Sequence, residues 1–195
     1  MQELKKHKII LASQSPRRRE LLSNLGLNFE VIPANLEEKA DSYSSFGELV
    51  MELARQKAEH IAKDHPGRII VASDTIVVID NRVLNKPLDR NDAADMLATL
   101  AGRQHQVYTS LYIIDGPNSR MVADYSVTDV FFSSLSAEEI ERYLDTGEPF
   151  DKAGAYGIQG FGSKLVEKIS GCFFSVMGFP VALFARRMKE LGYLV

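Results

Sequence analysis

The sequence has 195 residues, of which 45% are hydrophobic and 25% are charged, and its formal net charge is −3. This length and composition favour one folded domain and exclude a fibrous or disordered chain. The slightly acidic balance argues against a nucleic-acid partner, because surfaces that bind nucleic acids usually carry a basic excess.

The sequence also lacks the marks of a membrane or secreted protein. No apolar run approaches the roughly 20 residues needed to cross a bilayer, and the opening MQELKKHKII lacks the apolar segment of a signal peptide. We therefore expect a cytoplasmic protein without a membrane partner. The single cysteine, Cys172, excludes an internal disulfide, and the four histidines lack zinc-ligand spacing. Carboxylates are the expected ligands of any metal.

The first predicted elements are a strand near residues 8–13 and a helix near residues 16–25. Ser15 is a good N-cap, and Pro16 suits the first helical position. A short strand at NFEVIP follows, and apolar residues at helical spacing predict a long amphipathic helix over residues 45–65.

Three arginines occupy the first turn of the predicted helix at residues 16–25. That turn carries the positive end of the helix dipole and unpaired N–H groups, so acidic residues are expected there. Arg17, Arg18 and Arg19 therefore indicate a bound anion. Since each residue turns the helix by about 100°, the three cannot all face one anion, and we expect Arg19 to point into solvent.

The rest of the chain alternates strands and helices. The run RIIVASDTIVVID predicts a buried strand, with a turn at Asp80 and Asn81. Further elements are predicted as a helix at 91–101, strands at 104–114 and 119–132, a helix from Ser136 with a capping box, a glycine-rich loop at 147–163, a strand at 164–169 and a helix at 180–191. The order predicts an α/β fold in a single domain, residues 1–195.

Several polar residues interrupt apolar patterns, and each allows two interpretations. Asp74 lies within the buried run and needs a cation, hydrogen bonds or a proton; a strand-end turn or a structural ion pair explains it equally well. Lys57 lies on the apolar stripe of the long helix, where a side chain that reaches to the surface is the simpler interpretation. Lys86 alone looks like an ordinary loop lysine, Glu38 like surface charge and His105 like a strand-edge residue.

The loop GEPFDKAGAYGIQGFGS contains five glycines, which permit close approach of the backbone to a ligand. A flexible connector is the alternative, but Phe150, Tyr156, Ile158 and Phe161 are apolar residues that a solvated linker does not need. Among them, Gln159 has an amide that can donate and accept at once.

The motifs LASQSPRRREL, LEE, LARQKA, SDTIVV, NKP, GRQHQVYT, GEPFDKAGAYGIQG and SVMGFPV occur in this order, so the sequence resembles the Maf family of nucleotide pyrophosphatases over nearly its whole length. The resemblance implies a mixed sheet with flanking helices in two lobes around a deep cleft, related to the inosine triphosphate pyrophosphatases. It also implies a divalent cation, Mg²⁺ or Mn²⁺, often a homodimer, and hydrolysis of a nucleoside triphosphate between the α and β phosphates.

Within that family the sequence is similar to the dTTP/UTP pyrophosphatase branch. The resemblance places the proton acceptor at Asp74 and the specificity positions at Arg17, Thr75 and Gln159. Other family positions fall on the residues Ser13, Arg18, Glu38, Lys57 and Lys86.

The chemistry of these residue types agrees with such a reaction. Arg18, Lys57 and Lys86 can neutralise charge on phosphate oxygens. Since Mg²⁺ favours carboxylate and phosphate oxygens, Glu38 and Asp74 are the expected metal ligands. We expect Asp74 to orient or deprotonate the attacking water while Glu38 helps to hold the metal, although the two roles could be exchanged.

Selection of the base is a separate question. The amide of Gln159 complements the N3–H donor and carbonyl acceptors of uracil or thymine, but a flipped amide also pairs with cytosine. Fixed neighbours must therefore hold its orientation. Two alternative functions stay open: a pyrophosphatase for purine or modified nucleotides, and a non-enzymatic nucleotide-binding regulator of cell division.

Overall fold

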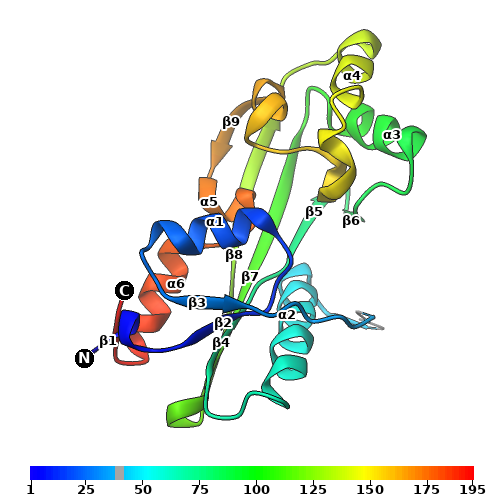
Figure 1. Cartoon of the computed structure of the whole chain (residues 1–195). Helices are drawn as coiled ribbons and strands as arrows, with labels where there is room; N and C mark the ends of the chain where they lie inside the picture. Colours follow the sequence, from blue (N-terminus) through cyan, green and yellow to red (C-terminus); the bar gives the residue numbers. More distant parts are fainter. Residues whose placement is uncertain (38–41) are drawn as a thin grey trace. The chain divides into compact units, whose positions relative to one another are not determined.

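The computed structural model describes residues 1–37 and 42–195 (Figure 1). It divides into two compact units, each assembled from separate stretches of chain. Unit 1 comprises Met1–Asp74, Thr109–Ser126 and Gly178–Val195, and unit 2 comprises Thr75–Tyr108 and Val127–Met177.

The sheet of unit 1 is mixed. Strand β2 (Ile9–Leu11) pairs in parallel with both β3 (Phe29–Val31) and β4 (Ile69–Ala72), and β4 pairs antiparallel with β7 (Gln104–Asp115). All residues of β2 and β4 are buried, as expected for parallel strands that are covered on both faces.

Three helices cover this sheet. Helix α2 (Phe46–Ala62) packs the small side chains of Ala54 and Ala58 against Ile10 and Ile70 of the strands. Figure 1 shows α1 (Pro16–Asn24) and α6 (Val181–Glu190) on the other side of these strands. The hydroxyl of Ser15, the predicted N-cap of α1, accepts the backbone N–H of Arg18, and the hydroxyl of Ser45 caps α2 in the same way.

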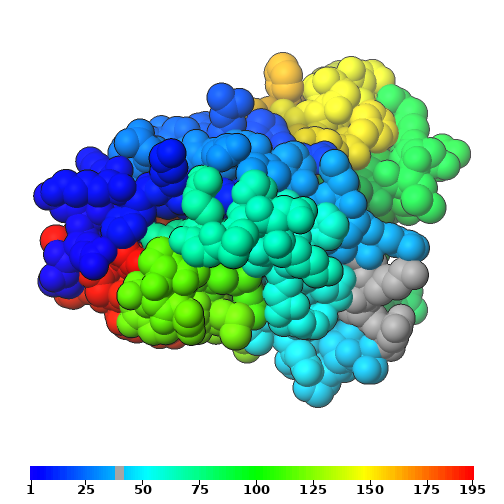
Figure 2. All heavy atoms as spheres, turned by 60° about the horizontal axis from the view of Figure 1, so that its bottom comes forward, coloured from blue at the N-terminus to red at the C-terminus, as the bar shows by residue number. Residues whose placement is uncertain are grey.

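The ends of the chain meet in unit 1. Strand β1 (Gln2–Glu3), followed by the 3₁₀ turn η1 (Leu4–Lys6), pairs in parallel with β10 (Tyr193–Leu194). Figure 2 accordingly shows the blue N-terminal segment beside the red C-terminal one. The fully buried carboxylate of Asp115 accepts hydrogen bonds from the Tyr193 hydroxyl at 2.8 Å and from Arg120 at 2.9 Å. This network ties β10 to the turn η2 (Gly116–Asn118).

Unit 2 begins with a hairpin. Strands β5 (Thr75–Ile79) and β6 (Arg82–Leu84) pair antiparallel across Asp80 and Asn81, whose φ angles of 49° and 59° are those of a type I′ turn. The other elements that lie in unit 2 are α3 (Arg90–Leu100), α4 (Ala137–Leu144), η3 (Glu148–Asp151), η4 (Ala153–Ala155), η5 (Gly160–Leu165), β9 (Val166–Ser170) and α5 (Phe173–Met177). Strand β8 (Arg120–Phe132) pairs with β7 and β9.

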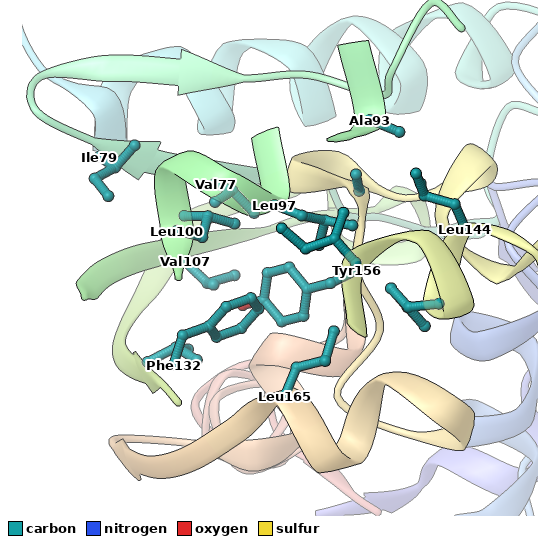
Figure 3. Close-up of a cluster of buried hydrophobic side chains, with 14 residues drawn as sticks. Val77, Ile79, Ala93, Leu97, Leu100, Val107, Phe132, Leu144, Tyr156 and Leu165 are labelled. Carbon is teal, nitrogen blue, oxygen red and sulfur yellow. The ribbon is translucent and has the colours of Figure 1, made fainter. Parts of the chain in front are cut away.

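An aromatic cluster lies at the centre of the unit 2 core. Figure 3 shows the Tyr156 ring beside Phe132 and near Val107, and the two ring centroids are 4.6 Å apart in an edge-to-face arrangement. Tyr156 comes from the glycine-rich loop, so this loop contributes directly to the core.

The predicted elements are largely confirmed, with one instructive difference. The run at residues 68–80 is not one strand, because β4 ends at Ala72 and β5 begins at Thr75. The backbone of Asp74 instead bonds Ser110: its N–H donates to the Ser110 hydroxyl at 3.0 Å, and its carbonyl accepts the Ser110 N–H at 2.9 Å. Asp74 therefore lies in a break between two strands.

Candidate functional site

The candidate site in unit 1 lies at the carboxyl ends of β2 and β4. From β2 the chain passes through α1 to β3 on one side, whereas β4 lies on the other side of β2. Ligands of open α/β sheets bind at such a change in strand order. Because Leu11 is the register partner of Val71, Ser13 follows β2 at the same edge where Ser73 and Asp74 follow β4.

The start of α1 is held by serine hydroxyls. The buried hydroxyl of Ser13 accepts the Ser15 N–H and a hydrogen bond from Arg18 Nη1, both at 3.2 Å. The first turn contains no acidic residue, so Arg17 and Arg18, both half-buried, lie at the positive end of the dipole. Arg19 is exposed, as predicted.

Arg18 and Ser73 share an acceptor that the sequence analysis did not single out. The carbonyl oxygen of Gly178 accepts Arg18 Nε at 2.8 Å and the Ser73 hydroxyl at 3.1 Å. Gly178 has a φ of 116°, which favours glycine. The sequence signal was the glycine in MGFP just before the last helix, to which no role was given. Through this oxygen the arginine-rich helix start is connected to the end of β4.

Lys57 and Asp74 form an ion pair, with 2.5 Å between Nζ and Oδ1. Their side chains are only 12% and 14% exposed, so Lys57 does not extend to the surface and the simpler interpretation of its position is wrong. Helix α2 supplies the ammonium group and the break after β4 supplies the carboxylate. Removing either partner would take this ion pair from a nearly buried charge.

Three predicted site residues belong to unit 2. Thr75 is half-buried at the start of β5, whereas Lys86 and Gln159 are exposed on loops. The Gly154 N–H donates to the carbonyl of Asn85 at 3.1 Å, which joins the loop of Lys86 to the glycine-rich loop of Gln159. Lys86 also lines a hollow of about 380 Å³ between β6 and α3.

The predicted metal ligands are only partly described. Glu38 lies outside the described residues. Within residues 1–37 and 42–195, no three or more His, Cys, Asp or Glu side chains form a group that could hold a metal ion. The metal site therefore stays a prediction, with Asp74 as its described member.

The glycine-rich loop is ordered by its own side chains rather than being a solvated connector. Tyr156 and Ile158 are buried, whereas Phe150 and Phe161 are 38% and 62% exposed, so only part of its apolar set contributes to the core. The Tyr156 hydroxyl lies 2.7 Å from Nε2 of His105, which is itself buried. His105 thus lies inside unit 2 and not at a solvent-facing strand edge.

Burial shifts the pKa values of these groups. Loss of water lowers the pKa of the His105 imidazole to about 4 and raises that of the Tyr156 hydroxyl. Both groups are therefore neutral at pH 7. They stabilise the loop by packing and hydrogen bonding, and neither offers a charge that could bind a ligand.

Together these features define a mixed α/β protein. The N-terminus of α1 is suited to bind an anion, and a Lys–Asp ion pair lies at the carboxyl ends of parallel strands. The chain belongs to the Maf family: residues 8–191 match the family described as Maf-like protein. No helix among the described residues is long and apolar enough to cross a membrane.

Curated relatives match over almost the whole chain. The dTTP/UTP pyrophosphatase of Carboxydothermus hydrogenoformans is 48% identical over 186 residues, which cover 95% of this chain and 100% of that protein. The dTTP/UTP pyrophosphatase of Caldicellulosiruptor bescii is 44% identical over 190 residues, covering 95% and 96%. Among solved structures, a HAM1 protein from Coxiella burnetii has a TM-score of 0.49 and 18% identity, covering 82% of this chain and 80% of that one.

Proposed function

We propose that this chain hydrolyses dTTP and UTP between the α and β phosphates, giving the nucleoside monophosphate and pyrophosphate. Relatives named dTTP/UTP pyrophosphatase, at 44% and 48% identity over at least 95% of both chains, support this substrate class. The structural observation that carries the proposal is the Lys57–Asp74 ion pair, placed after β4 at the edge where the arginine-rich α1 begins.

Hydrolysis of a phosphoanhydride requires a positioned water molecule and neutralisation of charge on the phosphate oxygens. In our proposal Asp74 orients the water or accepts its proton, since its backbone is fixed by Ser110 and its carboxylate by Lys57. Arg18 and Lys57 stabilise the phosphates, and Lys86 is proposed for the same role on the family resemblance alone. The Ser13 hydroxyl orients the Arg18 guanidinium.

A divalent cation, Mg²⁺ or Mn²⁺, is part of the proposal. Mg²⁺ is usually bound through one or two carboxylates and completes its coordination with substrate phosphates and water, which suits a site with Asp74 and Glu38 as protein ligands. When bound, the ion neutralises charge on the phosphate oxygens.

Arg17, Thr75 and Gln159 are proposed to select the base. The exposed amide of Gln159 can donate to one carbonyl of uracil or thymine and accept the N3–H. Because the substrates are nucleoside triphosphates of the cell interior, we propose that the protein acts in the cytoplasm. A homodimer is also proposed on the family resemblance. Analytical ultracentrifugation, which measures the mass of the protein in solution, tests this oligomeric state.

The deciding experiment is pyrophosphate release from dTTP, UTP, CTP, GTP, 7-methyl-GTP and ITP, with Mg²⁺ or Mn²⁺, for three proteins. These are the unsubstituted chain, Asp74→Asn and the control Asp64→Asn, which changes an exposed carboxylate after α2. We expect fast turnover of dTTP and UTP that Asp74→Asn loses by about 100-fold or more and Asp64→Asn retains.

The other outcomes separate the alternatives. Preference for a purine nucleotide would assign the chain to another substrate class. Nucleotide binding without turnover of any substrate would favour a regulator, and near-normal turnover by Asp74→Asn would remove this carboxylate from the chemistry.

A further inference from the structure

Glu148, at the start of the glycine-rich loop, makes more hydrogen bonds than an ordinary loop carboxylate. Its Oε2 accepts the Phe161 N–H at 2.8 Å, and its Oε1 accepts the Gly162 N–H at 3.0 Å. Oε1 also accepts the Tyr143 hydroxyl at 2.9 Å. The carboxylate is half-buried and belongs to none of the motif positions assigned to the reaction.

Tyr143 extends this connection to the other end of the same loop segment. Its hydroxyl, which donates to Glu148, accepts the Gly157 N–H at 3.1 Å. The N–H groups of residues 161 and 162 therefore bond the Glu148 carboxylate directly, and that of residue 157 is connected to it through the Tyr143 hydroxyl. The segment between them contains Gln159.

The glycines of this segment confirm how tightly it is closed. A Cβ at Gly162 would lie 2.2 Å from the Gly157 carbonyl oxygen, and one at Gly160 would lie 2.5 Å from Glu148 Oε2. Gly160 also has a φ of 66°. These glycines are required by the loop's own packing on Glu148, which explains them without a ligand.

Glu148 is itself held from both sides. Its N–H donates to the Thr146 hydroxyl at 3.2 Å, and its carbonyl accepts Lys152 Nζ at 2.6 Å. Such over-determined hydrogen bonding produces a rigid support, whereas Gln159 within the segment is exposed.

We propose that Glu148 is a positioning residue for base selection: its carboxylate closes residues 157–162 into one conformation and so presents the Gln159 amide in one orientation. This inference rests on the proposed function. Gln159 alone does not distinguish uracil from cytosine, because its amide can flip and then pair with cytosine. A fixed loop conformation supplies the missing constraint. A flip is costly only when the surrounding groups are fixed and a mismatch leaves buried polar groups unpaired.

The test uses Glu148→Gln, which places an amide NH₂ against backbone N–H donors, and Tyr143→Phe, which removes only the bridging hydroxyl. Glu167→Gln is the matched control, because Glu167 is exposed on β9. Amide hydrogen exchange in the substrate-free proteins measures closure of the loop. We expect exchange at Phe161 and Gly162 to quicken by about tenfold or more in Glu148→Gln and to be unchanged in the control.

The second readout is the ratio of kcat/KM for UTP to that for CTP. We expect Glu148→Gln to lower this ratio by about tenfold, mainly through a higher KM for UTP, and Tyr143→Phe to lower it less. In a Gln159→Ala background, adding Glu148→Gln should change the ratio by less than about twofold, because both residues act through the same amide.

Unchanged exchange, an unchanged ratio in Glu148→Gln, or an equal further loss in the Gln159→Ala background would each overturn the inference. If the unsubstituted chain hydrolyses neither dTTP nor UTP, the proposed function fails together with base selection, while the exchange measurement still decides whether Glu148 closes the loop.

Discussion

Replacing His105 should remove a specific part of the protein's acid sensitivity. The imidazole is 2% exposed, its Nε2 contacts the Tyr156 hydroxyl, and its Nδ1 has no hydrogen-bond partner among the described residues. Burial lowers the pKa of this imidazole from 6.5 to about 4. Since the folded state resists protonation, the unfolded state binds more protons between these two values.

The sign and size of the effect follow from this difference. Stability is retained above pH 6.5 and falls as the pH is lowered from 6.5 to 4, because protonation then favours the unfolded chain. At about 1.4 kcal/mol per pKa unit, the total loss is about 3 kcal/mol. His105→Gln lacks the titrating group and should lose less stability over the same interval, although it starts from a lower value because packing against Phe132 is disturbed.

Urea unfolding from pH 7 to pH 4, followed by far-UV circular dichroism because the chain has no tryptophan, measures this difference. His60→Gln, an exposed substitution on α2, serves as the control for replacing an imidazole. The free energies of unfolding of His105→Gln and the unsubstituted chain should converge as the pH falls. Curves that stay parallel down to pH 4 would refute the reasoning.

Three other results are expected. Lys57→Met should reduce kcat for dTTP by about 100-fold or more, because Asp74 loses the ammonium that fixes its carboxylate; a KM change alone would contradict this role. Gly162→Ala should lower the free energy of unfolding by about 1–3 kcal/mol, since the new Cβ meets the Gly157 carbonyl, and an unchanged Tm would argue against the closed loop. Chelation of divalent cations with EDTA should abolish pyrophosphate release, and added Mg²⁺ should restore it; full activity in EDTA would exclude the proposed metal.

Local chemistry made much of the fold predictable. The N-cap at Ser15, the capping box from Ser136 to Glu139 and the turn at Asp80 and Asn81 depend on residues within a few positions of one another, and all three are observed. Such signals fix where helices and hairpins begin and end.

Features that depend on distant partners were not predictable in the same way. The run around Asp74 looks like one strand because apolar residues flank Ser73 and Asp74 on both sides, whereas the partner of the Asp74 backbone at the break is Ser110, 36 residues later. The partner of Lys57 is similarly hidden, since it becomes visible only when α2 packs beside β4. Glu148 was missed because two partners of its carboxylate are backbone N–H groups, which leave no mark on the sequence.

The interleaving of the two units bears on how the protein is made. Residues 75–177 contain all of unit 2, so the whole of unit 2 is synthesised before unit 1 is complete. Unit 1 still waits for residues 178–195, which supply α6, the strand that pairs with β1 and the carbonyl that joins Arg18 to Ser73. The link between Arg18 and Ser73 therefore cannot form until residue 178 has been synthesised, after the last residue of unit 2.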